Sequence, residues 1–157
     1  MVNDVICYLK NTLGESNGCG IAAPQIGDHH RIIVINVDTK VCHYPGAVDI
    51  PMKAMINPQW KPLSEEMQYD YEGCLSVSNE IRGKVKRYTE IEYSYYTEEG
   101  EYITDTATSF TARLLQHEID HLEGIIFMER VDMTQKNALA TLFNVNHLGL
   151  RDKVRAE

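Results

Sequence analysis

The chain has 157 residues, of which 43% are hydrophobic and 24% are charged, and its formal net charge is −8 at pH 7. This length suits one domain with its own core, so we expect residues 1–157 to form a single domain. The negative charge argues against a general nucleic-acid-binding surface, since such surfaces neutralise phosphates with Lys and Arg. The apolar runs are too short to span a bilayer and the N-terminus lacks the pattern of a secretory signal, so we expect a cytoplasmic protein.

The first part of the chain is expected to contain one helix, one loop and two strands. Apolar residues at helical spacing predict an amphipathic helix over residues 2–13, which Gly14 ends. The glycine-rich segment 17–27, NGCGIAAPQIG, predicts an irregular loop. RIIVINV at 31–37 predicts a buried strand and KAMINPQW at 53–60 predicts a second one.

Aromatic and β-branched residues dominate residues 66–107. Such residues pack well on a pleated surface, so EMQYDYEG, KVKRYTEIEYSYY and EYITDTAT predict strands. TEEGE at 97–101, between the last two segments, predicts a hairpin turn. We therefore expect an antiparallel sheet in this section.

A second helix is predicted after this sheet, with Thr108 or Ser109 as its N-cap and Gly124 at C′. An apolar stripe and a polar stripe follow the helical repeat. The apolar stripe comprises Ala112, Leu115, Ile119 and Leu122, and the polar stripe comprises Arg113, Gln116, Asp120 and Glu123. A last helix is predicted from Asp132 or Thr134 onward. The expected fold class is α+β, with antiparallel sheets wrapped around a central helix.

The central helix carries HEIDH at 117–121, in which His117 and His121 are four residues apart. Their side chains lie about 40° apart around the helix axis, so both imidazoles can bind one metal ion. Glu118 beside them is suited to act as a general base. Because single histidines are more often structural and the short motif also arises by chance, a metal site needs a third ligand to support it.

The usual downstream positions for a third ligand are empty. In metzincin peptidases a third His follows six residues after the second, and here that position is Phe127. Thermolysin-like peptidases take a Glu from a later helix, but the corresponding segment ALATLFNVNHLG contains none. The third ligand is therefore expected upstream, among several acids, the four cysteines, His29, His30 and His43.

Cys74 is the most suitable upstream candidate. It lies in YEGCLSV, where Gly73 permits a close backbone approach and the flanking residues are typical of strands. A Cys, two His and a water would complete a tetrahedral catalytic site with one exchangeable position. The alternative is a small buried thiol without a ligand role, as most free cysteines are.

GCGIAAPQ at 18–25 is a third notable segment. It lacks the third glycine and preceding strand of a dinucleotide-binding motif, and the Gly-Lys-Ser/Thr ending of a P-loop. A tight turn before the next strand is one interpretation. In the other, a rigid loop holds Gln25 as a neutral amide donor for an oxyanion.

In this order, GCGIAAPQ, EGCLS and HEIDHLEG resemble the three signature motifs of the peptide deformylases, over residues 18–124. The resemblance implies a metal-dependent hydrolase that removes the N-formyl group from the formylmethionine of nascent polypeptides and releases formate. It implies one divalent metal ion per chain, natively Fe(II), with zinc, nickel or cobalt able to occupy the same site. The implied partner is the N-formylmethionyl nascent peptide, with no direct nucleic-acid specificity and no membrane, and we expect a monomer.

Residue by residue, the resemblance implies that Cys74, His117 and His121 bind the metal ion together with water or hydroxide. Glu118 would take a proton from that water and deliver it to the departing amine. A thiolate also suits a borderline metal such as Fe(II) or Zn(II). The central helix would thus be a metal-binding helix.

Four further site residues follow from the same resemblance. Gln25 through its amide and Leu75 through its backbone N–H would stabilise the tetrahedral oxyanion. Gly20 would place its backbone along the substrate, and Cys19 would lie near the pocket for the methionine side chain. For Cys19, a plain turn or core role is an equal alternative.

Supporting roles are open for several charged residues. Glu72 could pair with Arg82 or Arg87 and support the Cys74 loop, or be an ordinary surface acid. Asp120 could orient a neighbour, or cap the solvent face of its helix. The basic segment LRDKVR at 150–155 prompts the hypothesis of a contact with the ribosome surface.

The chain also departs from the family pattern. The segment before the first motif is about twenty residues shorter than the resemblance leads one to expect, and Ser78-Asn79-Glu80 replaces a turn such as Pro-Gly after the second motif. Two rival functions remain open. One is another HExxH metallopeptidase, and the other is a catalytically inactive domain in which the metal only stabilises the fold.

Overall fold

The computed structural model describes residues 1–74 and 82–131. These residues belong to two compact units, the first formed by Met1–Gln68 and Arg87–Ile126, the second by Tyr69–Lys86 and the residues from Phe127 onward. Within the described residues, none of the helices has the length and apolar character needed to cross a membrane.

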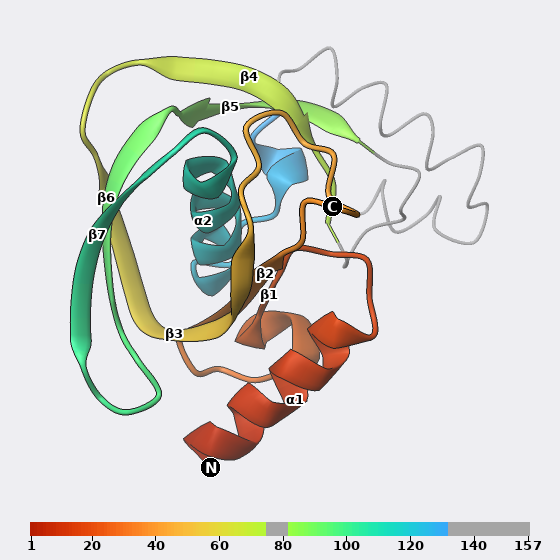
Figure 1. The fold of residues 1–157 in the computed structure, drawn as a ribbon, viewed down its shortest axis with the longest axis vertical. Helices are drawn as coiled ribbons and strands as arrows, with labels where there is room; N and C mark the ends of the chain where they lie inside the picture. The colour runs from red at the N-terminus through yellow and green to blue at the C-terminus, as the bar shows by residue number, and fades with distance from the viewer. Residues whose placement is uncertain (75–81, 132–157) are drawn as a thin grey trace. The chain divides into compact units, whose positions relative to one another are not determined.

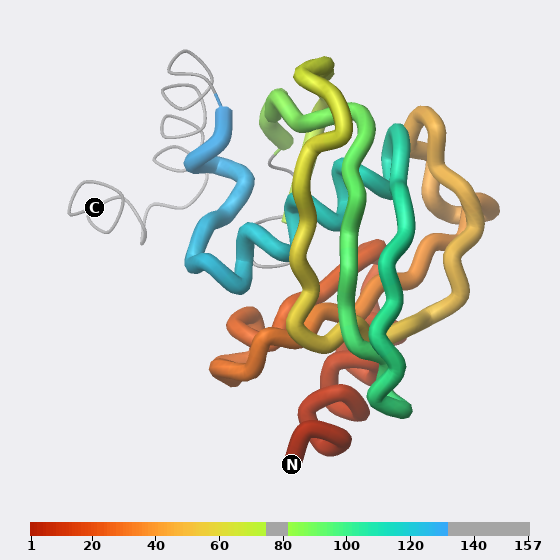
Figure 2. Tube along the Cα trace, turned by 90° about the vertical axis from the view of Figure 1, so that its left-hand side faces the viewer, coloured from red at the N-terminus to blue at the C-terminus, as the bar shows by residue number. Residues whose placement is uncertain are grey.

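The first unit is built on a five-stranded sheet in which every pair of neighbouring strands is antiparallel. Figure 2 shows β6 and β7 running side by side, as expected for the two strands of a hairpin. In spatial order the strands are β1 (Gly20–Ala22), β2 (Ile32–Val37), β3 (Ile50–Pro62), β6 (Glu90–Tyr96) and β7 (Tyr102–Thr108). The predicted antiparallel sheet is confirmed, and the predicted strand at 53–60 is part of the longer β3.

Two helices pack against this sheet, α1 (Val2–Gly14) and α2 (Ser109–Leu122) (Figure 1). Strand β2 contributes to the core under each helix, because successive side chains of a strand point to opposite faces. Ile32 and Val34 share a core with residues of α1, whereas Ile33 and Ile35 share a core with residues of α2. Burial on both faces explains why this strand has a continuous apolar sequence rather than an alternating one.

Both helices end where the sequence predicts. Helix α1 closes at Gly14, one residue beyond the predicted range. Helix α2 follows Thr108, one of the two predicted N-cap residues. Gly124 has a φ of 75°, and its N–H lies 3.1 Å from the carbonyl oxygen of His121. This left-handed residue just past the helix is the predicted C′ glycine.

The prediction of an irregular loop over residues 17–27 is wrong in part. Gly20–Ala22 form strand β1, with Gly20 opposite Ile35 of β2, and Ala23–Ile26 form the 3-10 helix η1. A strand of three residues leaves little local signal. It exists because its backbone groups pair with β2, and this long-range pairing is not visible in the local composition.

The second unit contains most of a two-stranded sheet, β4 (Met67–Glu72) and β5 (Gly83–Tyr88). Each of these strands begins or ends in the first unit. The second unit also has a small core, formed by Val85, Phe127 and Val131 with Cys74 and Met128 packed against them. The predicted last helix and the basic segment at 150–155 lie outside the described residues.

Candidate metal centre

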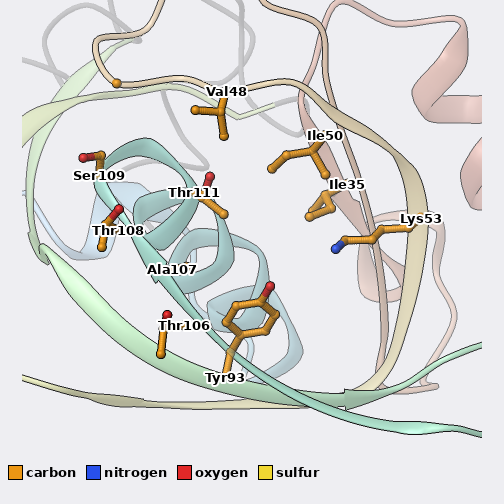
Figure 3. Close-up of a pocket in the computed structure, with 11 residues that line it drawn as sticks. Ile35, Val48, Ile50, Lys53, Tyr93, Thr106, Ala107, Thr108, Ser109 and Thr111 are labelled. Carbon is orange, nitrogen blue, oxygen red and sulfur yellow. The ribbon is translucent and has the colours of Figure 1, made fainter.

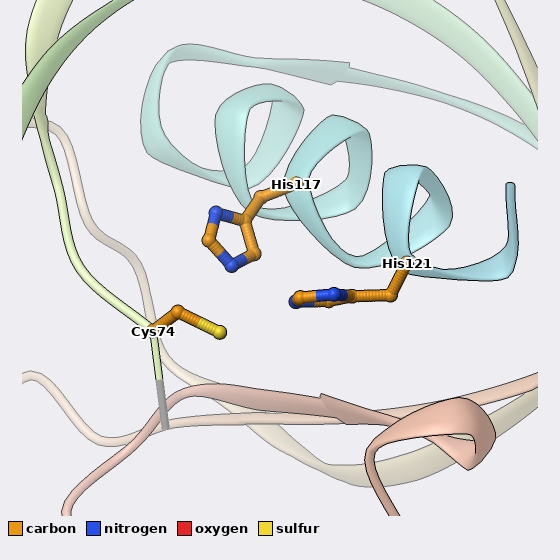
Figure 4. A group of neighbouring side chains, drawn as sticks. All are labelled: Cys74, His117 and His121. Carbon is orange, nitrogen blue, oxygen red and sulfur yellow. The ribbon is translucent and has the colours of Figure 1, made fainter. Parts of the chain in front are cut away.

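His117 and His121 lie on consecutive turns of α2, as the four-residue spacing predicts. Both side chains are buried, and their ring centroids are 5.0 Å apart with the rings nearly perpendicular. Figure 4 shows the two imidazoles projecting from the same side of the helix. Two nitrogen ligands are thus held on a rigid element.

Cys74, His117 and His121 form a group that could hold a metal ion (Figure 4). One sulfur and two nitrogen atoms, one from each side chain, lie within 4.8 Å of one another. A thiolate with two imidazoles is a donor set that zinc and ferrous iron accept, and three protein ligands leave a coordination position for water or substrate. The other cysteines and histidines considered as upstream ligands are not part of this group.

Glu118 is buried beside the histidines, with 3% of its surface exposed. Its Oε1 lies 4.0 Å from Nε2 of His117. A carboxylate excluded from bulk water is well suited to exchange protons with a reacting group, since no solvent competes for its position.

Gln25 lies in η1 with its side-chain amide held by its own loop. Its Oε1 accepts a hydrogen bond of 2.8 Å from the backbone N–H of Ala22. Because the oxygen accepts this bond, the orientation of the amide is fixed. Its NH2 group is then the end that can donate a hydrogen bond, as stabilisation of an oxyanion requires. Leu75, the other predicted oxyanion donor, lies outside the described residues.

Cys19 precedes β1 and lies between two neighbours that affect its thiol. Its Sγ is 3.7 Å from Sγ of Cys42, a buried residue. Burial, followed by the nearby Cys42 and the negative charge of Glu118, raises the pKa of Cys19 to about 12. The thiol is therefore protonated at neutral pH, which fits an apolar wall better than a nucleophile.

The predicted polar stripe of α2 is buried rather than solvated, apart from Glu123. Arg113 donates a 2.6 Å hydrogen bond to the carbonyl oxygen of Gln68, and Gln116 bonds to both backbone groups of Tyr88. Asp120 pairs with Arg87 at 2.6 Å. The suggestion that Asp120 caps the solvent face is therefore wrong.

Arg87 is the residue whose importance to α2 the sequence left open. It is only 4% exposed, at an inward position of β5 where Gly83 and Val85 are also buried. The sequence offered a signal, because Arg87 alternates in phase with the buried residues of its strand. A buried guanidinium requires an anionic partner, so this position indicates an ion pair. Glu72 is also buried, at 5% exposed, so the suggestion that it is a surface acid is wrong.

A cavity of about 390 Å³ in the first unit is a separate feature (Figure 3). Its wall contains the amine of Lys53 and the hydroxyl of Tyr93, together with Ile35, Ile50 and Thr111. None of the predicted site residues that the structure describes lines it. The cavity is therefore not the predicted catalytic site.

Comparison with known proteins relates this chain to one family. A family model described as polypeptide deformylase matches residues 1–137. Peptide deformylase 1 of Nitrosomonas europaea is 41% identical over 128 residues, which cover 82% of this chain and 72% of the relative. Peptide deformylase 2 of Ralstonia nicotianae is 41% identical over 134 residues, covering 85% of this chain and 75% of the relative.

Solved structures agree with these sequence matches. The class I type b peptide deformylase from Acinetobacter baumannii with bound Met-Ala-Ser has a TM-score of 0.74 and 37% identity, covering 83% of this chain and 80% of that chain. A peptide deformylase from Synechococcus elongatus in complex with actinonin has a TM-score of 0.76 and 30% identity, covering 87% of this chain and 71% of that chain. Fold and sequence therefore point to the same family.

Proposed function

We propose, since this chain belongs to the polypeptide deformylase family, that Cys74, His117 and His121 hold the metal ion on which this family depends. The chain is an enzyme that removes the N-formyl group from nascent peptides. The observation that carries the proposal is the group of one thiol and two imidazoles, with the buried carboxylate of Glu118 beside His117.

The native metal is proposed to be Fe(II), with zinc, nickel or cobalt able to replace it. The donor set supports this choice, because a thiolate with imidazoles favours borderline and soft ions over magnesium or calcium. When bound, such an ion supplies Lewis acidity and lowers the pKa of a coordinated water to about 7.

Glu118 is proposed as the general base and acid. It takes a proton from the attacking water and returns it to the departing amine, so that formate and a free N-terminus result. Its burial supports this role, since a carboxylate fixed in a dry site exchanges protons in one geometry. General acid–base catalysis of this kind contributes about 10²–10⁴-fold in rate.

Gln25 and Leu75 are proposed to donate hydrogen bonds to the developing oxyanion, Gln25 from its side-chain NH2 and Leu75 from its backbone N–H. The bond from Ala22 to Oε1 supports the assignment of Gln25, because it fixes the orientation of the amide. One oxyanion donor contributes about 3 kcal/mol. Gln25→Ala should therefore retain its metal and lose about 10²–10³-fold in kcat, measured by formate release alongside metal analysis.

The substrate is proposed to be the N-formylmethionyl end of a nascent chain. The bound Met-Ala-Ser in the Acinetobacter baumannii structure supports a peptide substrate. Gly20 would lie along its backbone, and the protonated thiol of Cys19 would border the methionine side chain. We further propose that residues 1–157 act as one catalytic domain, because β4 and β5 each include residues of both units. This domain is proposed to act in the cytoplasm.

The first test is formate release from formyl-Met-Ala-Ser by anaerobically purified protein loaded with Fe(II). Cleavage of an acetyl-capped peptide at internal bonds is measured in parallel, because such cleavage would indicate a metallopeptidase. Formate release without internal cleavage is the expected outcome. A loaded protein that releases no formate would contradict the proposal.

The ligand set is tested by metal content. Cys74→Ala, His117→Ala and His121→Ala should each reduce bound metal well below one ion per chain. Cys7→Ala is the matched control, since Cys7 is an exposed cysteine of α1 and should not affect metal content. A full complement of metal in Cys74→Ala would exclude this thiol as a ligand.

A further inference from the structure

Gly20 is buried at the first position of β1, and nothing in its backbone conformation requires glycine. Positive φ angles among the described glycines occur at Gly27, Gly46, Gly100 and Gly124, and Gly20 is not one of them. It pairs with Ile35 in a regular antiparallel register. Any residue can adopt this extended conformation, so the reason for glycine must be space.

The missing side chain points toward α2. Successive residues of a strand alternate between faces, so Gly20 and Ala22 share one face and Ile21 lies on the other. Ala22 belongs to the core that contains α2 residues such as Leu115 and Ile119, whereas Ile21 belongs to the core under α1. Position 20 is therefore on the α2 side of the sheet.

The side chain of Glu118 occupies the space that a side chain at position 20 would need. A Cβ added to Gly20 would lie 2.6 Å from Oε1 of Glu118 and 2.7 Å from both Cδ and Cγ. These separations are far below van der Waals contact. Because Cγ is involved as well as the terminal oxygen, a rotation of the carboxylate alone would not relieve the clash.

Glu118 has little room to move away. Its side chain is almost completely buried, and Nε2 of His117 lies 4.0 Å from its Oε1. Interiors are close-packed, so an added methyl group displaces its neighbours instead of filling empty space.

We infer that Gly20 is a positioning residue for Glu118, and that the absence of a side chain at position 20 creates the space in which the general base is held. This inference rests on the proposed role of Glu118. It adds to the backbone contact with substrate proposed for Gly20 a separate steric role toward the enzyme's own carboxylate.

A double-mutant cycle on thermal stability tests the contact without any use of activity. Gly20→Ala should lower Tm by about 3–9 °C, as overpacking of a buried site does. In the Glu118→Ala background the clashing atoms are absent, so the same substitution should change Tm by less than about 2 °C. Gly14→Ala is the matched control, because its Cβ would meet only Cε of Met52 at 3.8 Å.

Each outcome of the double-mutant cycle either supports or contradicts the inference. An equal loss of Tm in both backgrounds would overturn the inference, because the methyl group would then clash with something other than Glu118. If Gly20→Ala alone yields no folded protein, recovery of folded protein in the double variant supports the inference. Failure to recover it contradicts the inference.

Kinetics distinguish positioning of the base from contact with the substrate. With formyl-Met-Ala-Ser, Gly20→Ala should lose about 10–100-fold in kcat with KM nearly unchanged and metal retained. A raised KM with unchanged kcat would mean that the substitution only obstructs the substrate, and would contradict the inference. Full activity of Glu118→Ala would refute the proposed base, while the Tm cycle would still report on the contact.

Discussion

Helices α1 and α2 have nearly equal lengths, 13 and 14 residues, and pack on the same sheet, yet their polar residues have different environments. In α1 the buried positions are all apolar, namely Val5, Ile6, Leu9 and Leu13. In α2 the buried positions include apolar residues and also six charged or polar side chains, namely Arg113, Gln116, His117, Glu118, Asp120 and His121.

The difference shows how a helix can contribute either stability or chemistry. Burial of apolar side chains on α1 needs no specific partner, because the hydrophobic effect is non-directional. Each buried polar group on α2 costs free energy unless another group bonds to it. Gln68 of β4 and Arg87 and Tyr88 of β5 supply such bonds. Helix α2 therefore depends on specific bonding partners elsewhere in the fold, whereas α1 does not.

The largest expected effect comes from the chemistry of α2. Glu118→Gln should lower kcat by about 10²–10⁴-fold, because an amide of the same shape cannot accept the proton. Metal content and Tm should remain close to those of the unmodified protein. Formate release and metal analysis on the same preparation check this, and a variant with unaltered kcat would remove Glu118 from the mechanism.

The buried ion pair of α2 should be worth more than a similar pair on α1. Arg87 and Asp120 are 2.6 Å apart and 4% and 6% exposed, so Asp120→Ala should cost about 3–5 kcal/mol by leaving a buried charge without this carboxylate. On α1, Lys10 pairs with Glu98 at 2.7 Å in partial contact with solvent. Lys10→Ala should therefore cost only about 0–1 kcal/mol.

Urea denaturation at neutral pH measures both variants. Equal losses of unfolding free energy would show that burial does not distinguish the two pairs, and the comparison between the helices would fail.

An apolar truncation on α1 should affect stability and leave catalysis unaltered. Leu9 is fully buried in the core under α1, so Leu9→Ala should cost about 2–5 kcal/mol. At a temperature where the variant is folded, its kcat and metal content should equal those of the unmodified protein. A selective loss of kcat in folded Leu9→Ala would show that α1 also shapes the active site.

The smallest expected effect concerns neutral polar residues. Gln116 exchanges two hydrogen bonds with Tyr88, at 3.0 and 2.8 Å, so Gln116→Ala should cost about 1–3 kcal/mol through the backbone groups it leaves behind. Asn11→Ala on the exposed face of α1 is the matched control and should change the unfolding free energy by less than about 0.5 kcal/mol. Chemical denaturation of both variants decides whether the contrast extends to uncharged side chains.

Much of the fold was predictable because its signals are local. The apolar spacing of α1, the continuous apolar run of β2 and the glycine that ends α2 each act within a few neighbouring residues. Strand β1 was not predictable in this way, since its three residues form a strand only by pairing with β2. The burial of the α2 polar stripe was also missed, because helical periodicity cannot distinguish solvent from a bonded partner on another strand.

For the candidate site, the sequence by itself determined the residue types and their order. The His117-Glu118-x-x-His121 spacing places two imidazoles on one helical side, and three motifs in order indicate the deformylase family. Only the tertiary structure decided that the carboxylate of Glu118 fills the space left by Gly20, and that Arg87 pairs with Asp120. The physical reason is that close packing and buried charge pairing join residues far apart in the chain, whose separation no local pattern encodes.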